Sequence, residues 1–184
     1  MIINISKNIQ HIIEIPEKWE LFTNKSYTAQ IQLADSSRIY NAPGMPGVVY
    51  NILEDAYEKV HESGYIVTGA AGEMWPIGEK SLGKYNIRPE EITYTPQPVS
   101  TLETDTVYAG IRIPEDVEFT LETDYGEKAL LRGNRPEIPH AGGDYVLVFA
   151  KKQNGIYSPD FTDSGRIVNG TIFKVLYKPL SEIA

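Results

Sequence analysis

The stretch GYIVTGAAGEMWPI, residues 64–77, gives the clearest indication of fold class in the sequence. Residues 65–68 combine an aromatic ring with β-branched side chains, which is the composition of a strand. Gly69 and Gly72 then bracket a short connection, and apolar residues return at 74–77. We therefore expect a β-hairpin, with Trp75 and Pro76 covering the core beneath it.

Just upstream, the apolar residues of the segment 48–62 recur at the spacing of an amphipathic helix. Counted from Val49, they fall at i, i+3, i+4, i+7, i+8 and i+11, which is one face of a 3.6-residue repeat. Ser63 and Gly64 can end the helix, because glycine readily adopts the left-handed cap conformation. The pattern predicts one clear amphipathic helix at about 48–62.

Further from this region, the sequence is typical of strands separated by turns. The predicted strands are 27–33, 107–113, 117–121, 129–132 and 145–150. Asn-Gly pairs at 154–155 and 169–170 indicate two-residue hairpin turns. After the second pair, residues 171–177 fit either a return strand or a short helix with Phe173 and Tyr177 one turn apart.

A proline-containing run at 95–98 is the best candidate for a domain boundary. Each proline disfavours the α conformation in the residue before it, so this run is expected to be extended. We predict an N-terminal half at 1–94, a linker at 95–100 and a C-terminal half at 101–184. The expected fold class is α+β and β-rich, with two small antiparallel-sheet halves.

The composition is that of a globular protein and argues against several classes of function. Hydrophobic residues make up 41% and charged residues 23% of the 184 residues, near the globular average. A net charge of −8 without a basic run argues against direct nucleic-acid binding. The lack of cysteine excludes disulfides, thiol nucleophiles and Cys-ligated zinc. No stretch approaches the ~20 apolar residues of a membrane span, and the first residues lack signal-peptide features, so we expect a soluble, cytoplasmic protein without membrane contact.

Two parts of the sequence align as divergent copies of one unit. Tyr65 aligns with Tyr145, and residues 27–31 align with 108–112 at an offset that agrees within one residue. The alignment predicts an internal duplication.

These copies resemble a short domain of phage and prophage proteins, in the family known for its Pro-Gly-Asp-Tyr-Gly motif. That family's pattern runs Gly-Asp-Tyr, then Gly-Glu, an aromatic residue and Pro, and later Phe and Tyr four residues apart. The first copy keeps Gly69, Gly72, Glu73, Trp75 and Pro76, and the second keeps Gly143, Asp144, Tyr145, Phe173 and Tyr177.

The sequence departs from the family pattern in both copies. The first copy has no Asp before Tyr65 and has Ser81 where a Phe should precede Tyr85. The second copy lacks the Gly-Glu-aromatic-Pro core, and the two matches cover less than half of the sequence. The resemblance implies a phage or prophage origin and a β-rich fold, and it implies no chemistry.

No motif with a known reaction mechanism is present, so we predict no catalytic residue outright. If the protein is an enzyme, the candidates are His140, Asp144 and Glu73, because a loop histidine near a carboxylate can act as acid or base. An ordinary loop histidine and a hairpin glutamate are the alternative explanation. The glycines at 69–72 match neither a dinucleotide fingerprint nor a P-loop, and the acidic clusters lack calcium-loop spacing. We therefore expect no metal and no cofactor.

The abundance of tyrosine favours a non-enzymatic accessory or binding protein. The sequence has 12 tyrosines, a residue type that is enriched at interfaces. We predict that Tyr65, Trp75, Tyr145 and Tyr157 contact a protein partner or a small molecule; core packing is the alternative explanation of these rings. A homo-oligomer is a further alternative. Two other functions stay open: an enzyme or nucleotide-binding protein with its site between the halves, and an acidic inhibitor that imitates nucleic acid.

Overall fold

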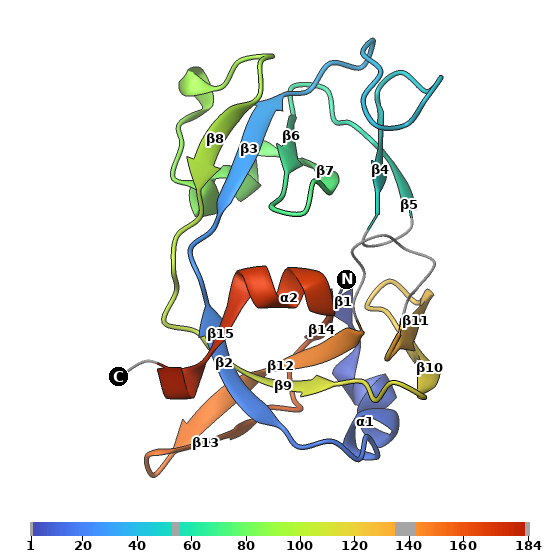
Figure 1. Ribbon diagram of the computed structural model, residues 1–184, viewed down its shortest axis with the longest axis vertical. Coiled ribbons are helices and arrows are strands. Elements are labelled where there is room, and N and C mark those ends of the chain that lie inside the picture. Colours follow the sequence, from blue (N-terminus) through green and yellow to red (C-terminus); the bar gives the residue numbers. More distant parts are fainter. Residues whose placement is uncertain (1, 53–55, 135–142, 183–184) are drawn as a thin grey trace. The chain divides into compact units, whose positions relative to one another are not determined.

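The computed structural model describes residues 2–52, 56–134 and 143–182, and these residues form two compact units (Figure 1). Unit 1 comprises Met1–Lys25 and Thr104–Ala184, and unit 2 comprises Ser26–Glu103. Strands account for 43% and helices for 17% of the protein, and the sheets are antiparallel. The predicted α+β, β-rich fold class is thus confirmed. No described helix is both long enough and apolar enough to cross a membrane.

Unit 1 is built on a seven-stranded sheet. Its strands are, in spatial order, β1 (Ile2–Ile3), β14 (Gly165–Asn169), β12 (Asp144–Gln153), β9 (Val107–Arg112), β2 (Glu20–Asn24) and β15 (Tyr177–Pro179), and β13 (Ile156–Pro159) pairs with β12. The remaining elements are a hairpin of β10 (Glu118–Glu122) and β11 (Lys128–Arg132), the helices α1 (Ile5–Ile13) and α2 (Gly170–Leu176), and the 3-10 helix η3 (Leu180–Glu182).

One face of this sheet buries aliphatic side chains. Alternate residues of β9 and β12 point to it, because successive strand residues face opposite sides. They pack with residues of α1, β10 and β11; the cluster includes Ile5, Ile12, Ile111, Leu121, Leu131, Val146 and Val148. The buried side chain of Asn8 joins α1 to β10, since its amide donates to the Glu122 carbonyl (2.7 Å) and its Oδ1 accepts from the Glu122 amide (2.9 Å).

The other face carries an aromatic cluster covered by α2. Its buried members are Phe22, Tyr108, Leu147, Phe173 and Tyr177. The ring of Phe173 stacks on Tyr145, with centroids 3.9 Å apart and planes at 3°. Of the two alternatives for residues 171–177, the helix is confirmed for 171–176. The strand β15 begins at Tyr177. The side chain of Asn169 caps the helix by accepting from the Thr171 amide at 2.9 Å.

Unit 2 consists of a four-stranded sheet and a hairpin. The sheet order is β7 (Met74–Ile77), β6 (Tyr65–Thr68), β3 (Thr28–Leu33) and β8 (Gln97–Ser100), and the hairpin is formed by β4 (Val48–Asn51) and β5 (Ala56–Lys59). Two 3-10 helices, η1 (Glu79–Tyr85) and η2 (Pro89–Glu91), follow β7. The buried core comprises Ala29, Ile31, Tyr65, Val67, Ile77, Leu82, Tyr85, Ile92 and Val99.

The predicted hairpin at 64–77 is confirmed as β6 and β7, with Tyr65 opposite Ile77 and Val67 opposite Trp75. Both Pro76 and Pro98 lie in edge strands of the sheet. Proline has no amide hydrogen to donate, so an edge strand is where it can be tolerated.

The predicted helix at about 48–62 is wrong. Residues 48–51 and 56–59 form β4 and β5, which pair antiparallel with Tyr50 opposite Tyr57. Val48, Val49 and Tyr50 are β-branched or aromatic and favour a strand. Burial alternates along β4, where Val49 and Asn51 are buried and their neighbours are half-buried. The apolar spacing fitted both a helix and a hairpin, and β4 and β5 pack against β7, which favours the hairpin.

The division into units differs from the predicted halves. Residues 97–100, within the predicted linker 95–100, form β8 and pair with β3 inside unit 2. The first 25 residues belong with the C-terminal part, because β2 pairs with β9 and β1 with β14. An edge strand that contains proline and a linker have similar local sequences. Only the pairing of such a segment with a distant strand distinguishes one from the other.

The predicted duplication is not confirmed. Both proposed copies contain an antiparallel pair, β3 with β6 and β9 with β12, but Tyr65 lies opposite Leu33 and Tyr145 opposite Arg112. Tyr65 is buried in the core of unit 2, whereas Tyr145 is half-buried and stacked on Phe173. The two tyrosines thus have different surroundings.

Candidate functional site

Glu73, one of the predicted catalytic candidates, is buried against the turn that precedes β7. Its Oε2 accepts from the Ala71 amide at 2.9 Å, and its backbone carbonyl accepts from the Gly69 amide at 2.8 Å. The carboxyl group fills the space beside Gly69, where an added Cβ would lie 1.9 Å from Oε1. The turn is therefore wrapped around its own glutamate, and burial raises the pKa of Glu73.

A second polar group, the hydroxyl of Tyr85, is buried near Glu73. Tyr85 is 1% exposed, and the side chains of Trp75 and Tyr27 are the polar neighbours of its hydroxyl. Burial is the main cause that raises the pKa of this hydroxyl strongly, and electrostatic interactions with Tyr27 and Glu73 act in the same direction. Tyr85 belongs to the buried core of unit 2 and Glu73 is 4% exposed, so neither group is accessible to a substrate in this structure.

Asp144, the second catalytic candidate, begins β12 in unit 1 and is also buried. Its Oδ2 accepts from the Arg132 amide at 2.9 Å, which ties β12 to the end of β11. The backbone is crowded here, since a Cβ on Gly143 would lie 2.2 Å from the Gly133 carbonyl oxygen. The Asp144 carboxylate thus joins two strands of unit 1, whereas the Glu73 carboxyl stabilises a turn of unit 2. His140, the third catalytic candidate, lies outside the described residues.

The four predicted contact residues differ in accessibility. Tyr65 is 5% exposed and packs in the core, so its ring is not available to a partner in this structure. Trp75, Tyr145 and Tyr157 are half-buried. The Lys152 ammonium lies 5.2 Å from the centre of the Tyr157 ring, a cation–π contact at the β12–β13 hairpin.

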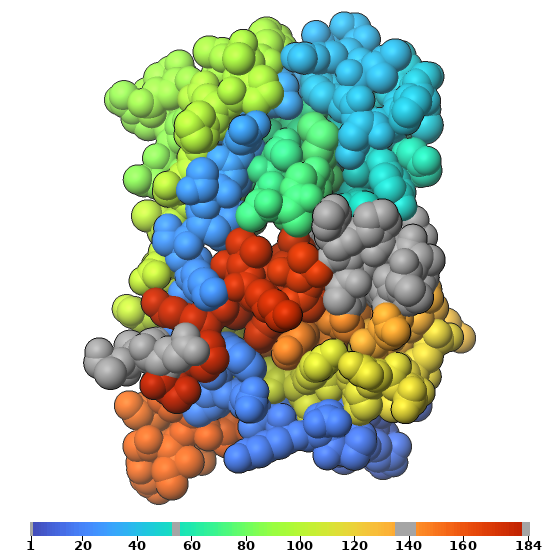
Figure 2. Space-filling model, viewed as in Figure 1, coloured from blue at the N-terminus to red at the C-terminus, as the bar shows by residue number. Residues whose placement is uncertain are grey.

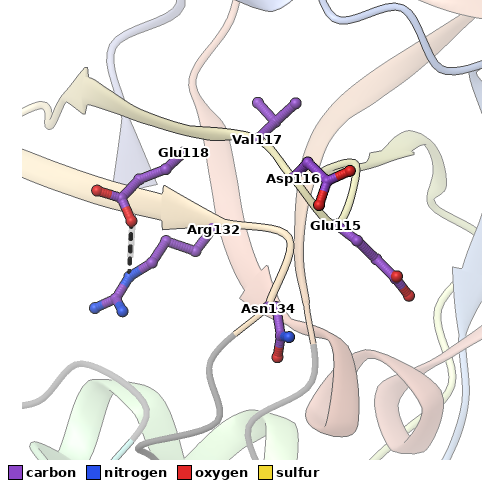
Figure 3. A pocket seen from close by; sticks show the side chains of 6 residues that line it. All are labelled: Glu115, Asp116, Val117, Glu118, Arg132 and Asn134. Atoms are coloured by element: carbon purple, nitrogen blue, oxygen red, sulfur yellow. Dashed lines mark ion pairs between the residues drawn. The ribbon is translucent and has the colours of Figure 1, made fainter.

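A small pocket lies beside the β10–β11 hairpin in unit 1 (Figure 3). It has a volume of about 150 Å³ and is lined by Glu115, Asp116, Val117, Glu118, Arg132 and Asn134. Figure 3 shows Glu118 and Arg132 pointing toward each other, with an Oε2–Nε distance of 3.6 Å. Ligand pockets usually enclose about 300–1,000 Å³, so this pocket is too small for a typical organic ligand. Among the described residues, no group of three or more histidines and carboxylates is placed to hold a metal ion.

A set of exposed and half-buried tyrosines in unit 2 was not predicted from the sequence. It comprises Tyr50 and Tyr57 on the β4–β5 hairpin and Tyr40 and Tyr94 on either side of Arg38, together with Ile39 and Met45; we call these residues the tyrosine surface. Tyr57 is 63% and Tyr94 56% exposed, and Tyr40 and Tyr50 are half-buried. The rings of Tyr50 and Tyr57 lie 5.0 Å apart as a cross-strand pair. Residues 36–50, light blue to cyan in Figure 2, contribute much of the visible surface of unit 2.

Hydrogen bonds hold the loop that carries this surface. The Asn41 side chain both donates to the Tyr50 carbonyl and accepts from the Tyr50 amide, each at 2.8 Å. Arg38 donates to the Tyr94 carbonyl (3.1 Å), and its guanidinium lies 5.7 Å from the Tyr40 ring. Gly47 has φ of +67°, and a Cβ there would lie 2.6 Å from the Ser36 carbonyl oxygen. The tyrosines are thus presented by an ordered scaffold.

The sequence contained one signal for this surface, the abundance of tyrosine. The sequence did not show which of the rings are exposed. The predicted helix placed Tyr57 on its apolar face, and the glycines and prolines of 41–47 indicate only a turn. Comparisons with protein-family models, curated proteins and solved structures gave no match for this protein.

Proposed function

We propose that this protein is a non-enzymatic binding protein that contacts a protein partner through the tyrosine surface of unit 2. The observation that carries the proposal is the exposure of Tyr57 (63%) and Tyr94 (56%) on a loop and hairpin fixed by hydrogen bonds. Tyrosine, methionine and arginine are enriched at the centres of protein interfaces, and all three occur here.

The chemistry of the surface favours a protein over a small molecule. Tyrosine rings combine an apolar face with a hydroxyl group, and the Arg38 guanidinium beside the Tyr40 ring adds a hydrogen-bond donor. Rigid rings lose little conformational entropy on binding, which suits them to contact an extended area of a partner. An origin in a phage or prophage stays part of the proposal, resting on the sequence resemblance alone.

The two buried carboxylates weigh against the alternative of an enzyme. Glu73 and Asp144 each accept a hydrogen bond from a nearby backbone amide, so each has a structural role that explains its presence. The alternative of an acidic inhibitor that imitates nucleic acid rests only on the net charge of −8.

The test uses a paired substitution and a matched control. The double variant Tyr57→Ala/Tyr94→Ala removes the two most exposed rings of the surface, and Tyr125→Ala removes a tyrosine that is 83% exposed in unit 1. Wild type and both variants are immobilised and used to capture proteins from lysate, after circular dichroism has shown that all three fold alike. We expect to find a protein that wild type and Tyr125→Ala bind and for which the double variant has an affinity lower by about 30-fold or more. This is the loss for two central aromatic residues worth about 1–2 kcal/mol each.

Two results would count against this proposal. A partner captured equally by all three proteins would show that the tyrosine surface is not the contact. Self-association of the wild type that the double variant abolishes would identify a homo-oligomer as the occupant in place of a different protein.

A further inference from the structure

Two Asn-Gly pairs lie in opposite environments within unit 1. Asn154 and Gly155 form the turn between β12 and β13, with φ of +51° and +82°. Both residues are exposed, and a Cβ on Gly155 would have nothing within 4 Å. Asn169 is 9% exposed, and its Oδ1 accepts from the Thr171 amide to cap α2.

An Asn-Gly pair has an inherent chemical reactivity. Glycine has no side chain to hinder its amide nitrogen, so that nitrogen can approach the preceding carboxamide. The Gly155 nitrogen would form a bond to Cγ of Asn154, and the bond between Cγ and Nδ2 would break. Ammonia leaves with the proton from the glycine amide, and a succinimide is formed. Water then opens either carbonyl of that ring, which gives aspartate or isoaspartate at 154.

We infer that Asn154 is a site of spontaneous deamidation in the folded protein and that the same reaction is suppressed at Asn169. The left-handed turn at 154–155 must open before the attack can occur, and a two-residue turn at an exposed hairpin tip opens at low cost. Asn169 must first release its cap hydrogen bond. Gly170 is also confined, because a Cβ there would lie 2.4 Å from the Gly143 carbonyl oxygen.

The product would change the charge and geometry of the β12–β13 hairpin. A neutral carboxamide becomes a carboxylate two residues from Lys152, whose ammonium contacts the Tyr157 ring. Isoaspartate also lengthens the backbone at a turn whose two-residue length sets the pairing of Gln153 with Ile156. Aged protein would therefore be a mixture of charge forms that differ at one hairpin.

The sequence provides a direct test with an internal control. Trypsin cleaves after Lys152, Arg166 and Lys174, so residues 153–166 carry Asn154 and residues 167–174 carry Asn169. The folded full-length protein is incubated in mildly alkaline buffer at physiological temperature, and the fraction of each peptide with an amide replaced by a carboxyl group is followed by mass spectrometry. Fragmentation spectra assign the change to Asn154 or to the adjacent Gln153.

We expect the 153–166 peptide to be modified at least about tenfold faster than 167–174, the factor that an extra opening free energy of about 1.4 kcal/mol produces. In concentrated urea the two peptides should be modified at similar rates, since the structural protection is gone. In the Asn154→Gln variant, modification of 153–166 should fall to the level of 167–174. Equal rates for both peptides in the folded protein, or modification only in urea, would overturn the inference.

Discussion

Replacement of Phe173 tests the packing of α2 on the aromatic face of the unit 1 sheet. The ring is buried and lies 3.9 Å from Tyr145, 4.7 Å from Phe22 and 5.1 Å from Tyr177, measured between centroids. Truncation of a buried phenylalanine to alanine costs about 3–5 kcal/mol, and each ring pair contributes about 0.5–1.5 kcal/mol beyond burial. These contributions overlap, so we expect Phe173→Ala to lower the free energy of unfolding of unit 1 by about 4 kcal/mol.

A second substitution separates stacking from burial. Phe173→Leu keeps most of the apolar volume and removes only the ring pairs, so it should cost about 2 kcal/mol. The exposed Ile156, in β13 of the same unit, offers a matched control, and Ile156→Ala should change stability by less than about 0.5 kcal/mol.

The two tryptophans allow each unit to be followed separately. Trp19 belongs to unit 1, where it packs edge-on against Phe161 (5.6 Å), and Trp75 lies in β7 of unit 2. In a Trp75→Phe background, Trp19 fluorescence reports the urea unfolding of unit 1. With a slope of about 2 kcal/mol per molar urea, Phe173→Ala should lower the midpoint by about 2 M. A shift below about 0.5 M would refute the packing of this ring described here.

Three further predictions concern the buried carboxylates. The raised pKa of Glu73 means that the folded state holds this proton more tightly than the unfolded state does. Unit 2 should therefore lose stability as the pH rises from the ordinary glutamate value of 4.5 through the folded-state value. In a Trp19→Phe background, thermal melts followed by Trp75 fluorescence should show this slope, and Glu73→Gln should remove it. Gly69→Ala should destabilise unit 2 by about 2 kcal/mol or more, because the new methyl group displaces the buried Glu73 carboxyl. As a control, Gly83→Ala should be neutral in the same measurement, because a Cβ at Gly83 has no other atom within 4 Å. Asp144→Ala should lower the stability of unit 1 by about 1–3 kcal/mol in urea titrations, because the Arg132 amide loses this acceptor. Asp144→Asn keeps an oxygen at this position and should cost clearly less. Equal losses for the two variants would contradict the role of Asp144 as the acceptor for the Arg132 amide.

Residues 64–77 show how much short-range sequence information can specify. Strand composition in 65–68, glycines at 69 and 72 and apolar residues at 74–77 each act over a few residues, and together they specify the β6–β7 hairpin. The same local reasoning found the strands at 27–33, 107–113 and 145–150, which became β3, β9 and part of β12. The turn at Asn154 was likewise found, because Asn-Gly supplies the two positive φ angles of a two-residue turn.

The segment 48–62 shows where local reasoning failed. Its apolar spacing was compatible with a helix, and the β-branched and aromatic residues 48–50 were equally compatible with a strand. Packing of β4 and β5 against β7 favoured the strands. The pair at 169–170 was also ambiguous, since the same Asn side chain that favours a turn caps α2 through the Thr171 amide.

Composition and near neighbours in the sequence were enough to predict the β-rich class, the β6–β7 hairpin and the lack of any disulfide. Long-range packing was needed to establish that residues 1–25 pair with the C-terminal part, that Glu73 and Tyr65 are buried, and that Tyr57 and Tyr94 are exposed. Burial differs from strand propensity in this respect because it is not a local property. Whether a tyrosine ring or a carboxyl group meets water depends on strands that are distant in the sequence and adjacent in space.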